Sequence, residues 1–278
     1  MKEHTVTGGG GIELHVEERG NADGRPILFI HGYTQSRRSW TKQLESTLAD
    51  DFRLVAMDNR GHGQSEKPES AYAESELWAD DVQRVIETLE LDRPVLVGWS
   101  YGGLIISDYL EKYGDEQIAG INLVGAISKN GTDDAMAVIG EEFVELIPGF
   151  ESTDAEESVN ALETFVERCV HGELLPEDRY FMLGYNAVVP PHVREGLHSR
   201  TLTHDEDLRA IEKPVLITHG EADTIVLPAA AEEHAELIGT AETSFYPEVG
   251  HSPFWEEPER FNRELREFAA GLEGETMT

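Results

Sequence analysis

Apolar and polar positions along the chain follow two periods in turn, and this alternation predicts strands separated by helices. Ile12, Leu14 and Val16 alternate with polar residues, as in a half-exposed antiparallel strand. Apolar spacings of three and four residues predict helices before the strand at 95–99 and near 257–270. Short apolar runs predict buried strands near 26–31, 53–58, 95–99, 118–127, 214–220 and 243–246. The predicted fold class is therefore α/β, with a mainly parallel sheet and helices on both faces.

One long interruption breaks this alternation between about residues 127 and 214, where no buried strand is evident. Short helical patterns such as Leu162, Phe165 and Val166 fill the stretch, and Pro190-Pro191 is one of the loops that separate them. We expect an all-helical insertion at 129–207 within a core formed by residues 1–128 and 208–278.

The charge balance changes the picture of the surface. The 278 residues include 22 basic and 55 acidic side chains, a net charge of −33, with acidic pairs scattered along the chain. Such self-repulsion destabilises a compact state unless salt screens it, and the composition resembles that of proteins from salt-accumulating halophiles. We expect a cytoplasmic protein that needs high salt to stay folded. An acidic surface for a basic partner is the alternative, but it predicts one concentrated patch, and nucleic acid would be repelled.

The cysteine count and the hydropathy of the chain further limit the class of protein. The single cysteine, Cys169, excludes a disulfide within the chain, and we expect it to act as small apolar packing. The first residues show no apolar signal region, and no apolar run approaches the length that crosses a bilayer. We therefore expect no membrane association.

The candidate nucleophile is Ser100, in Gly98-Trp99-Ser100-Tyr101-Gly102. An apolar strand precedes this Gly-x-Ser-x-Gly motif and a helical pattern follows it, the context of a tight strand-to-helix turn that exposes a serine hydroxyl. Gly98 and Gly102 come close together in such a turn and bring no Cβ into it. The N–H of Tyr101, at the helix N-terminus, would face a developing oxyanion. A chance match is the alternative, since the motif alone is common.

A serine nucleophile needs a base, and the base needs an orienting acid. Asp223 follows the strand at 214–220 and His251 follows the strand at 243–246, so both would lie with Ser100 at one edge of a parallel sheet. We assign His251 as general base and acid and Asp223 as the group that orients it. Asp223 could instead cap the helix expected near Pro228. His219, within its strand, is expected to support the core or the loop.

A second oxyanion donor should come from an earlier strand end. His31-Gly32-Tyr33 follows the strand at 26–31, and the N–H of Tyr33 would be that donor, unless His31-Gly32 is only a turn. The side chains of Tyr33, Trp99 and Trp255 neighbour the proposed triad, so we expect them to contact substrate.

Together these motifs resemble the α/β-hydrolase fold family over nearly the whole chain, from about Gly11 to Leu272. The segments that carry the resemblance, in order, are His31-Gly32-Tyr33, Asp58-Asn59-Arg60-Gly61-His62-Gly63-Gln64-Ser65, Gly98-Trp99-Ser100-Tyr101-Gly102-Gly103, His219-Gly220-Glu221-Ala222-Asp223 and Gly250-His251-Ser252-Pro253. The resemblance implies that the insertion is the family's cap and that Asp58 and Arg60 brace the structure.

The nucleophile also selects within that family. Its haloalkane dehalogenases and epoxide hydrolases have aspartate where this chain has Ser100, and the spacing looks most like small carboxylesterases and cofactor-free haloperoxidases. The resemblance implies hydrolysis of a small-molecule ester, lactone or thioester through an acyl-serine, with no metal or organic cofactor. The alternatives are a haloperoxidase, perhydrolase or carbon–carbon hydrolase with the same triad, and a ligand-binding receptor with a slow one. The substrate and the oligomeric state are unreadable from the sequence.

Overall fold

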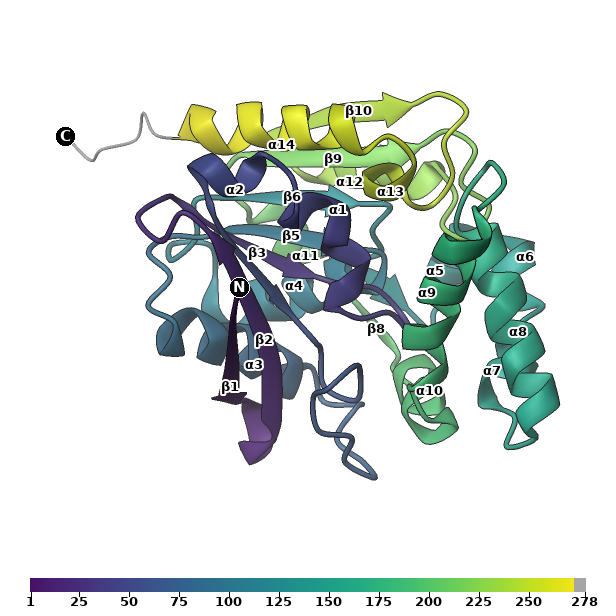
Figure 1. Cartoon of the computed structure of the whole chain (residues 1–278). Helices are drawn as coiled ribbons and strands as arrows, with labels where there is room; N and C mark the ends of the chain where they lie inside the picture. Colours follow the sequence, from purple (N-terminus) through teal and green to yellow (C-terminus); the bar gives the residue numbers. More distant parts are fainter. Residues whose placement is uncertain (273–278) are drawn as a thin grey trace.

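An eight-stranded sheet forms the centre of the molecule in the computed structural model, which describes residues 1–272 (Figure 1). The strand order is β1-β2-β4-β3-β5-β6-β9-β10. Strand β2 runs antiparallel to both of its neighbours, and the strands from β4 to β10 are parallel to one another. The strands are β1 (Lys2–Thr7), β2 (Glu13–Gly20), β3 (Pro26–Ile30), β4 (Arg53–Met57), β5 (Val95–Trp99), β6 (Gly120–Val124), β9 (Val215–Gly220) and β10 (Ala241–Tyr246).

Both faces of this sheet are apolar because helices cover both. Along β3, Leu28 and Ile30 pack into one hydrophobic cluster, whereas Ile27 and Phe29 pack into the other, as the two-residue period of a strand requires. The first face is covered by α3 (Ser75–Thr88), α4 (Tyr101–Tyr113), α11 (Asp205–Arg209) and α12 (Ala229–Leu237). The second is covered by the 3₁₀ turn η2 (Arg37–Trp40) with α1 (Thr41–Leu44), α2 (Leu48–Asp51), α13 (Pro253–Glu256) and α14 (Pro258–Gly271).

The predicted α/β sheet with flanking helices is confirmed, and one edge strand was missed. Strand β1 pairs with β2 from Lys2 opposite Glu18 to Thr7 opposite Glu13. Within β1 only Val6 is buried, so the strand lacks the alternation of apolar residues that marks the others.

The segment between β6 and β9 is helical apart from one short strand pair, which the prediction of an all-helical insertion did not include. Strand β7 (Lys129–Asn130) pairs antiparallel with β8 (Leu202–Thr203), so this pair joins the two ends of the segment. Figure 1 shows its helices gathered beside the edge at which the parallel strands end. They are α5 (Asp133–Ala137), α6 (Glu141–Val144), α7 (Ile147–Glu151), α8 (Ala155–Arg168), α9 (Pro176–Ala187) and α10 (Pro191–His198). We call residues 129–207 the insertion. These boundaries stay a prediction, and α11, which begins just before the second boundary, covers the sheet as described above.

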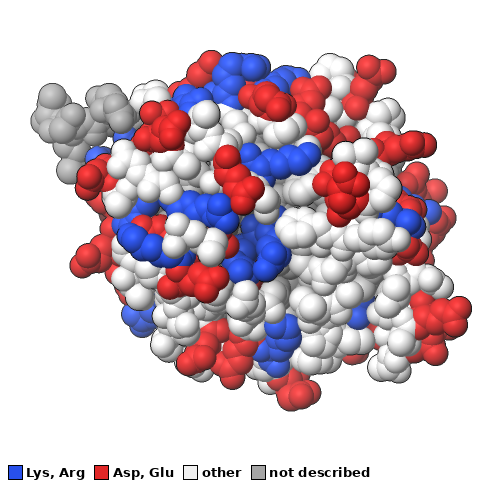
Figure 2. Space-filling model, viewed as in Figure 1, with Lys and Arg blue, Asp and Glu red and all other residues white. Residues whose placement is uncertain are grey.

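Acidic side chains are spread among basic and uncharged ones on the face seen in Figure 2, without forming one block. Carboxylates that repel one another across a surface raise the free energy of the compact state, and salt reduces this repulsion. None of the helices in the described part of the chain is long and apolar enough to cross a membrane.

We therefore expect stability to depend on ionic strength. The melting temperature should rise steadily between 0.05 and 2 M potassium chloride, because the Debye length falls to about 3 Å at 1 M salt. Thermal unfolding followed by circular dichroism measures this. A protein of near-neutral net charge, heated in the same salt series, is the control and should show a smaller rise. An unchanged melting temperature across the salt series would contradict the expectation.

Three buried histidines should make the protein sensitive to acid. Burial lowers the pKa of His31, His62 and His234 to about 3, far below the usual value near 6.5. Between these two pH values the unfolded chain binds protons that the native state does not, so stability is lost as the pH falls below 6.5. Each histidine contributes a slope of about 1.4 kcal/mol per pH unit.

The variant His62→Gln tests this contribution. Denaturant unfolding at pH 7, 6 and 5, in constant high salt, should show a free energy of unfolding that falls less steeply with acid in His62→Gln than in the wild type. The exposed His171 supplies a control, because its replacement by glutamine should leave the slope unchanged. Equal slopes for wild type and His62→Gln would refute the argument.

Candidate active site

Ser100 occupies a tight turn between β5 and α4. Its backbone has φ +56°, in the left-handed region that residues with a Cβ rarely adopt, and its N–H donates to the Val124 carbonyl at 2.9 Å. A Cβ at Gly98 would lie 2.7 Å from the Gly102 carbonyl oxygen, and one at Gly102 would overlap the Ile30 carbonyl oxygen. The two glycines therefore let the turn close, as the motif predicts, and hold the serine at the start of the helix.

Asp223 and His251 meet in the loops after β9 and β10. His251 Nδ1 lies 2.7 Å from Asp223 Oδ2, and both residues are buried. The other carboxylate oxygen of Asp223 accepts the N–H groups of Ile225 at 2.9 Å and Val226 at 3.0 Å. These bonds fix the orientation of the carboxylate, which in turn sets the His251 tautomer with its proton on Nδ1.

Two histidines keep the Asp223 carboxylate ionised. Burial raises the pKa of Asp223, but the opposing effect of His251 and hydrogen bonds from His219 and His251 holds that pKa well below its usual range. His219 Nε2 lies 3.2 Å from Asp223 Oδ2 and 2.9 Å from the Val226 carbonyl oxygen. His219 thus supports the Asp223 loop, one of the two roles expected for it from the sequence.

Ser100 and His251 are brought to the same place by their neighbours. The Trp99 indole N–H donates to the His251 carbonyl at 2.8 Å, and the two rings lie 5.4 Å apart. Val124 accepts the Ser100 N–H, and the next residue, Gly125, lies beside the His251 ring. A Cβ at Gly125 would be 3.1 Å from His251 Nδ1. His251 Nε2 is buried and has no hydrogen-bond partner among the described residues. That nitrogen is free to accept a proton.

The loop after β3 passes directly over Ser100. A Cβ at Gly32 would lie 2.9 Å from the Ser100 Cβ, so the absence of a side chain permits this approach. Among residues 1–272, no protein group accepts a hydrogen bond from the backbone N–H of Tyr33 or of Tyr101. Two unused donors on either side of a serine are the arrangement that an oxyanion hole requires.

His31 anchors this loop through two hydrogen bonds. Its Nδ1 lies 2.9 Å from the Gly32 carbonyl oxygen, and its Nε2 accepts the Asn59 N–H at 3.0 Å. A neutral imidazole makes both bonds, in agreement with its low pKa. Nearby, the buried Asp58 pairs with Arg37 at 2.7 Å, so Asp58 braces the structure instead of facing the serine.

A small apolar cavity of about 110 Å³ lies against Ser100, between the core and the insertion. Tyr33 and Tyr101 line it from the core side. The remaining wall residues are Ile127, Asn130, Gly131, Met136, Ile139, Phe143, Ile147, His198, Ile225 and Val226. Most of these belong to the insertion, where the sequence offered only helical spacing and gave no sign of which side chains face the serine.

Trp99 and Trp255, which we expected to contact substrate, are not part of this cavity wall. Both belong to the hydrophobic cluster on the opposite face of the sheet, where the Trp99 ring packs against Phe254 at 4.8 Å. Trp99 points there because side chains alternate along β5, so the residue before Ser100 faces away from it. Trp255 instead carries the Lys42 ammonium over its ring at 4.3 Å. Tyr33 does line the cavity.

One cluster in the described residues has the spacing of a metal site, formed by Asp108, Glu111 and His204. Asp108 Oδ1 already binds Arg200 Nη2 at 2.6 Å and lies 3.1 Å from His204 Nε2. The guanidinium occupies the carboxylate that a cation would need, so the cluster is an ion-pair network.

Known proteins share this sequence pattern and geometry. A sequence profile for the alpha/beta hydrolase fold matches residues 25–258. The chain belongs to the α/β-hydrolase family. The crystal structure of the esterase RhEst1 from Rhodococcus superimposes with a TM-score of 0.92, at 37% identity, over 98% of this chain and all of that one. A non-heme chloroperoxidase of Streptomyces lividans and a bifunctional esterase/perhydrolase of Acinetobacter calcoaceticus are each 28% identical over 95% of this chain and 98% of theirs. This α/β-hydrolase is accordingly an enzyme.

The close approach at Gly102 gives a structural prediction. Gly102→Ala should lower the free energy of unfolding by about 3 kcal/mol, because the new Cβ overlaps backbone atoms that cannot move aside. Gly184→Ala is the matched control: a Cβ there meets nothing within 4 Å, and alanine favours the surrounding helix α9. Denaturant unfolding measures both variants, and equal stability of the two would refute the close contact.

Proposed function

We propose that this α/β-hydrolase cleaves a carboxylic ester, lactone or thioester of a small molecule through an acyl-serine intermediate. The observation that carries the proposal is the buried Asp223–His251 pair, whose unpartnered Nε2 lies near the turn that holds Ser100, with two unused backbone donors beside the serine. The family supplies esterases as relatives, in agreement with this reading.

The chemistry follows from these positions. His251 Nε2 takes the hydroxyl proton as Ser100 Oγ attacks the ester carbonyl carbon, and the N–H groups of Tyr33 and Tyr101 stabilise the resulting oxyanion. The intermediate collapses, and His251 returns the proton to the leaving alcohol. Water then attacks the acyl-serine, again losing its proton to His251, which passes it back to Ser100 as the acid leaves. The ionised Asp223 stabilises the imidazolium in each half-reaction.

The insertion acts as a cap in this proposal. Its residues Met136, Phe143 and Ile147 line the same cavity as Ser100. An apolar cover excludes bulk water and so strengthens the electrostatic stabilisation of the oxyanion. Residues of the insertion also shape the space for the acyl or alcohol group, which makes the cap the part of the chain that selects substrate.

Perhydrolysis is a second candidate, because a relative that covers almost the whole chain is an esterase/perhydrolase. In that reaction, hydrogen peroxide replaces water in the attack on the acyl-serine and yields a peracid. The same three residues would act in both reactions. The two activities differ only in the molecule that accepts the acyl group, which is water or hydrogen peroxide. Peracid formation, detected by bromination of an added acceptor in the presence of carboxylic acid, peroxide and bromide, should be compared with ester hydrolysis by the same preparation.

Two substitutions test the triad. Ser100→Ala should lower kcat by about 10⁴-fold or more, and Asp223→Asn by about 10⁴-fold, because the asparagine amide favours the wrong His251 tautomer. Hydrolysis of acyl esters of graded chain length, measured in molar potassium chloride, provides the assay.

Both variants should melt cooperatively, which thermal unfolding checks. His192→Asn is a control of similar chemistry, since His192 lies on α10 outside the cavity wall. Retained turnover in Ser100→Ala would overturn the assignment of the nucleophile. Folded wild type without turnover on any ester would shift the proposal to the perhydrolase, the carbon–carbon hydrolase or the receptor.

A further inference from the structure

One buried cation in the insertion has no counter-ion among the described residues. Four arginines are buried, and Arg194 is the one without a carboxylate partner. The other three pairs have N–O distances of 2.7, 2.7 and 2.6 Å: Arg37 with Asp58, Arg60 with Asp81, and Arg200 with Asp108. Burying an unpaired charge costs several kcal/mol, and this chain has 55 acidic residues that could have supplied a partner.

Most hydrogen-bond donors of the Arg194 guanidinium also lack an uncharged acceptor. The side chain is 3% exposed and donates one hydrogen bond, from Nη2 to Ser158 Oγ at 2.9 Å. Nε and Nη1 are buried and have no partner within residues 1–272. A buried donor set that is left open in this way is suited to an acceptor from outside the chain.

Arg194 is not itself a wall residue of the Ser100 cavity, but it shares a face of α10 with one that is. His198, four residues later on the same helix, lines the Ser100 cavity, and residues at this spacing share one helix face. The His198 ring stacks on Tyr33 at 4.6 Å. Arg194 is near enough to Tyr33 for its charge to act on the phenol.

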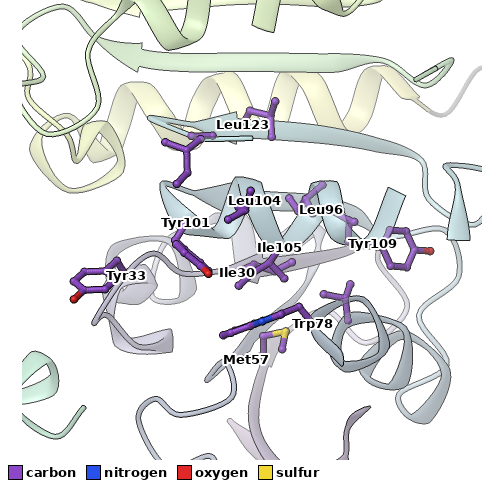
Figure 3. Close-up of a cluster of buried hydrophobic side chains, with 14 of the residues drawn as sticks. Ile30, Tyr33, Met57, Trp78, Leu96, Tyr101, Leu104, Ile105, Tyr109 and Leu123 are labelled. Atoms are coloured by element: carbon purple, nitrogen blue, oxygen red, sulfur yellow. The ribbon is translucent and has the colours of Figure 1, made fainter. Parts of the chain in front are cut away.

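Tyr33 provides a further unused donor at the same place. Its ring lies among Phe143, Phe150 and Phe165 of the insertion, and its hydroxyl is buried without a partner in the described structure. Figure 3 shows that this hydroxyl points away from the core cluster that packs around Tyr101 and Trp78. Tyr33 therefore extends from the oxyanion loop towards the insertion, with its polar end remote from the core.

We propose that Arg194 and the Tyr33 hydroxyl form an anion-binding subsite, so that the preferred substrates are esters that carry a carboxylate at the end remote from the scissile bond. The inference rests on the proposed ester hydrolysis and names its substrate class. A carboxylate would accept hydrogen bonds from Arg194 Nη1 or Nε and from Tyr33 Oη, and it would supply the missing counter-ion. Glu151, an acid whose charge adds to burial in raising the pKa of Tyr33, does not take this role, because it binds His198 Nδ1 at 3.1 Å and its side chain is 37% exposed.

Two series of substrates test the subsite and locate the carboxylate. In the first, monomethyl esters of dicarboxylic acids from succinic to suberic are compared with methyl esters of monocarboxylic acids of equal chain length. In the second, acetate esters of ω-hydroxy acids are compared with acetate esters of the matching alcohols. The readout is the ratio of kcat/KM for the charged ester to that for its neutral counterpart, in constant molar salt.

In the wild type this ratio should exceed about 10 at the best chain length in one of the two series. Arg194→Met should lower it by about 30-fold, because a charge-assisted hydrogen bond is lost while the volume of the stem is kept. Arg194→Lys should retain part of the preference. Arg179→Met is the matched control. Like Arg194, Arg179 links a neighbouring helix, α9, to α8, here through Glu163 and Glu167, but its side chain is 36% exposed.

A binding measurement separates this inference from the proposed function. In Ser100→Ala, the free dicarboxylate of the best chain length should raise the melting temperature, whereas the monocarboxylate should not. This shift should become smaller in Ser100→Ala/Arg194→Lys and vanish in Ser100→Ala/Arg194→Met. Wild-type ratios below 1 in both series, or equal ratios in Arg194→Met and Arg179→Met, would overturn the subsite. If the folded wild type hydrolysed none of these esters, the hydrolase proposal would be overturned instead. The binding measurement in Ser100→Ala would still decide the subsite.

Discussion

The close packing of three backbone segments around Ser100 is the constraint on which the rest of the site depends. The end of β3, the turn after β5 and the first turn of α4 approach so closely that Gly32, Gly98 and Gly102 leave no room for a side chain. The same packing forces the left-handed backbone at Ser100. The sheet must hold this strained turn rigidly, because a relaxed turn would withdraw the serine from the amide groups of Tyr33 and Tyr101.

A second layer of buried polar groups keeps the surrounding loops in place. His31 ties the loop after β3 to Asn59 as a neutral imidazole, and His219 ties the Asp223 carboxylate to the Val226 carbonyl. Each of these groups has a partner within 3.2 Å, so desolvation is offset locally. In the mechanism proposed above, the ionised Asp223 is the group in this network that opposes the positive charge formed on His251.

Much of this arrangement follows from the sequence, because strand periodicity and glycine spacing are local signals. The sheet, the turn at Ser100 and the loop positions of Asp223 and His251 required only that parallel strands end at one edge. The expectation that Trp99 and Trp255 contact substrate rested on sequence proximity to the triad. The structure instead packs both rings on the far face of the sheet, Trp99 through the alternation along β5 and Trp255 as part of α13. Arg194 gave no signal at all: its burial and its missing partner depend on contacts between α8, α10 and the oxyanion loop, which are distant in sequence.

The acidic surface and the buried cation act on different length scales. A net charge of −33 repels an anionic substrate at long range, which would slow its encounter in dilute buffer. In molar salt that repulsion is screened within about 3 Å of each charge, whereas a guanidinium that is 3% exposed is shielded much less. High salt would therefore remove the barrier to approach while leaving the attraction within the site. An acidic surface is therefore compatible with selectivity for a carboxylate, provided that the cation that binds the carboxylate is buried within the insertion.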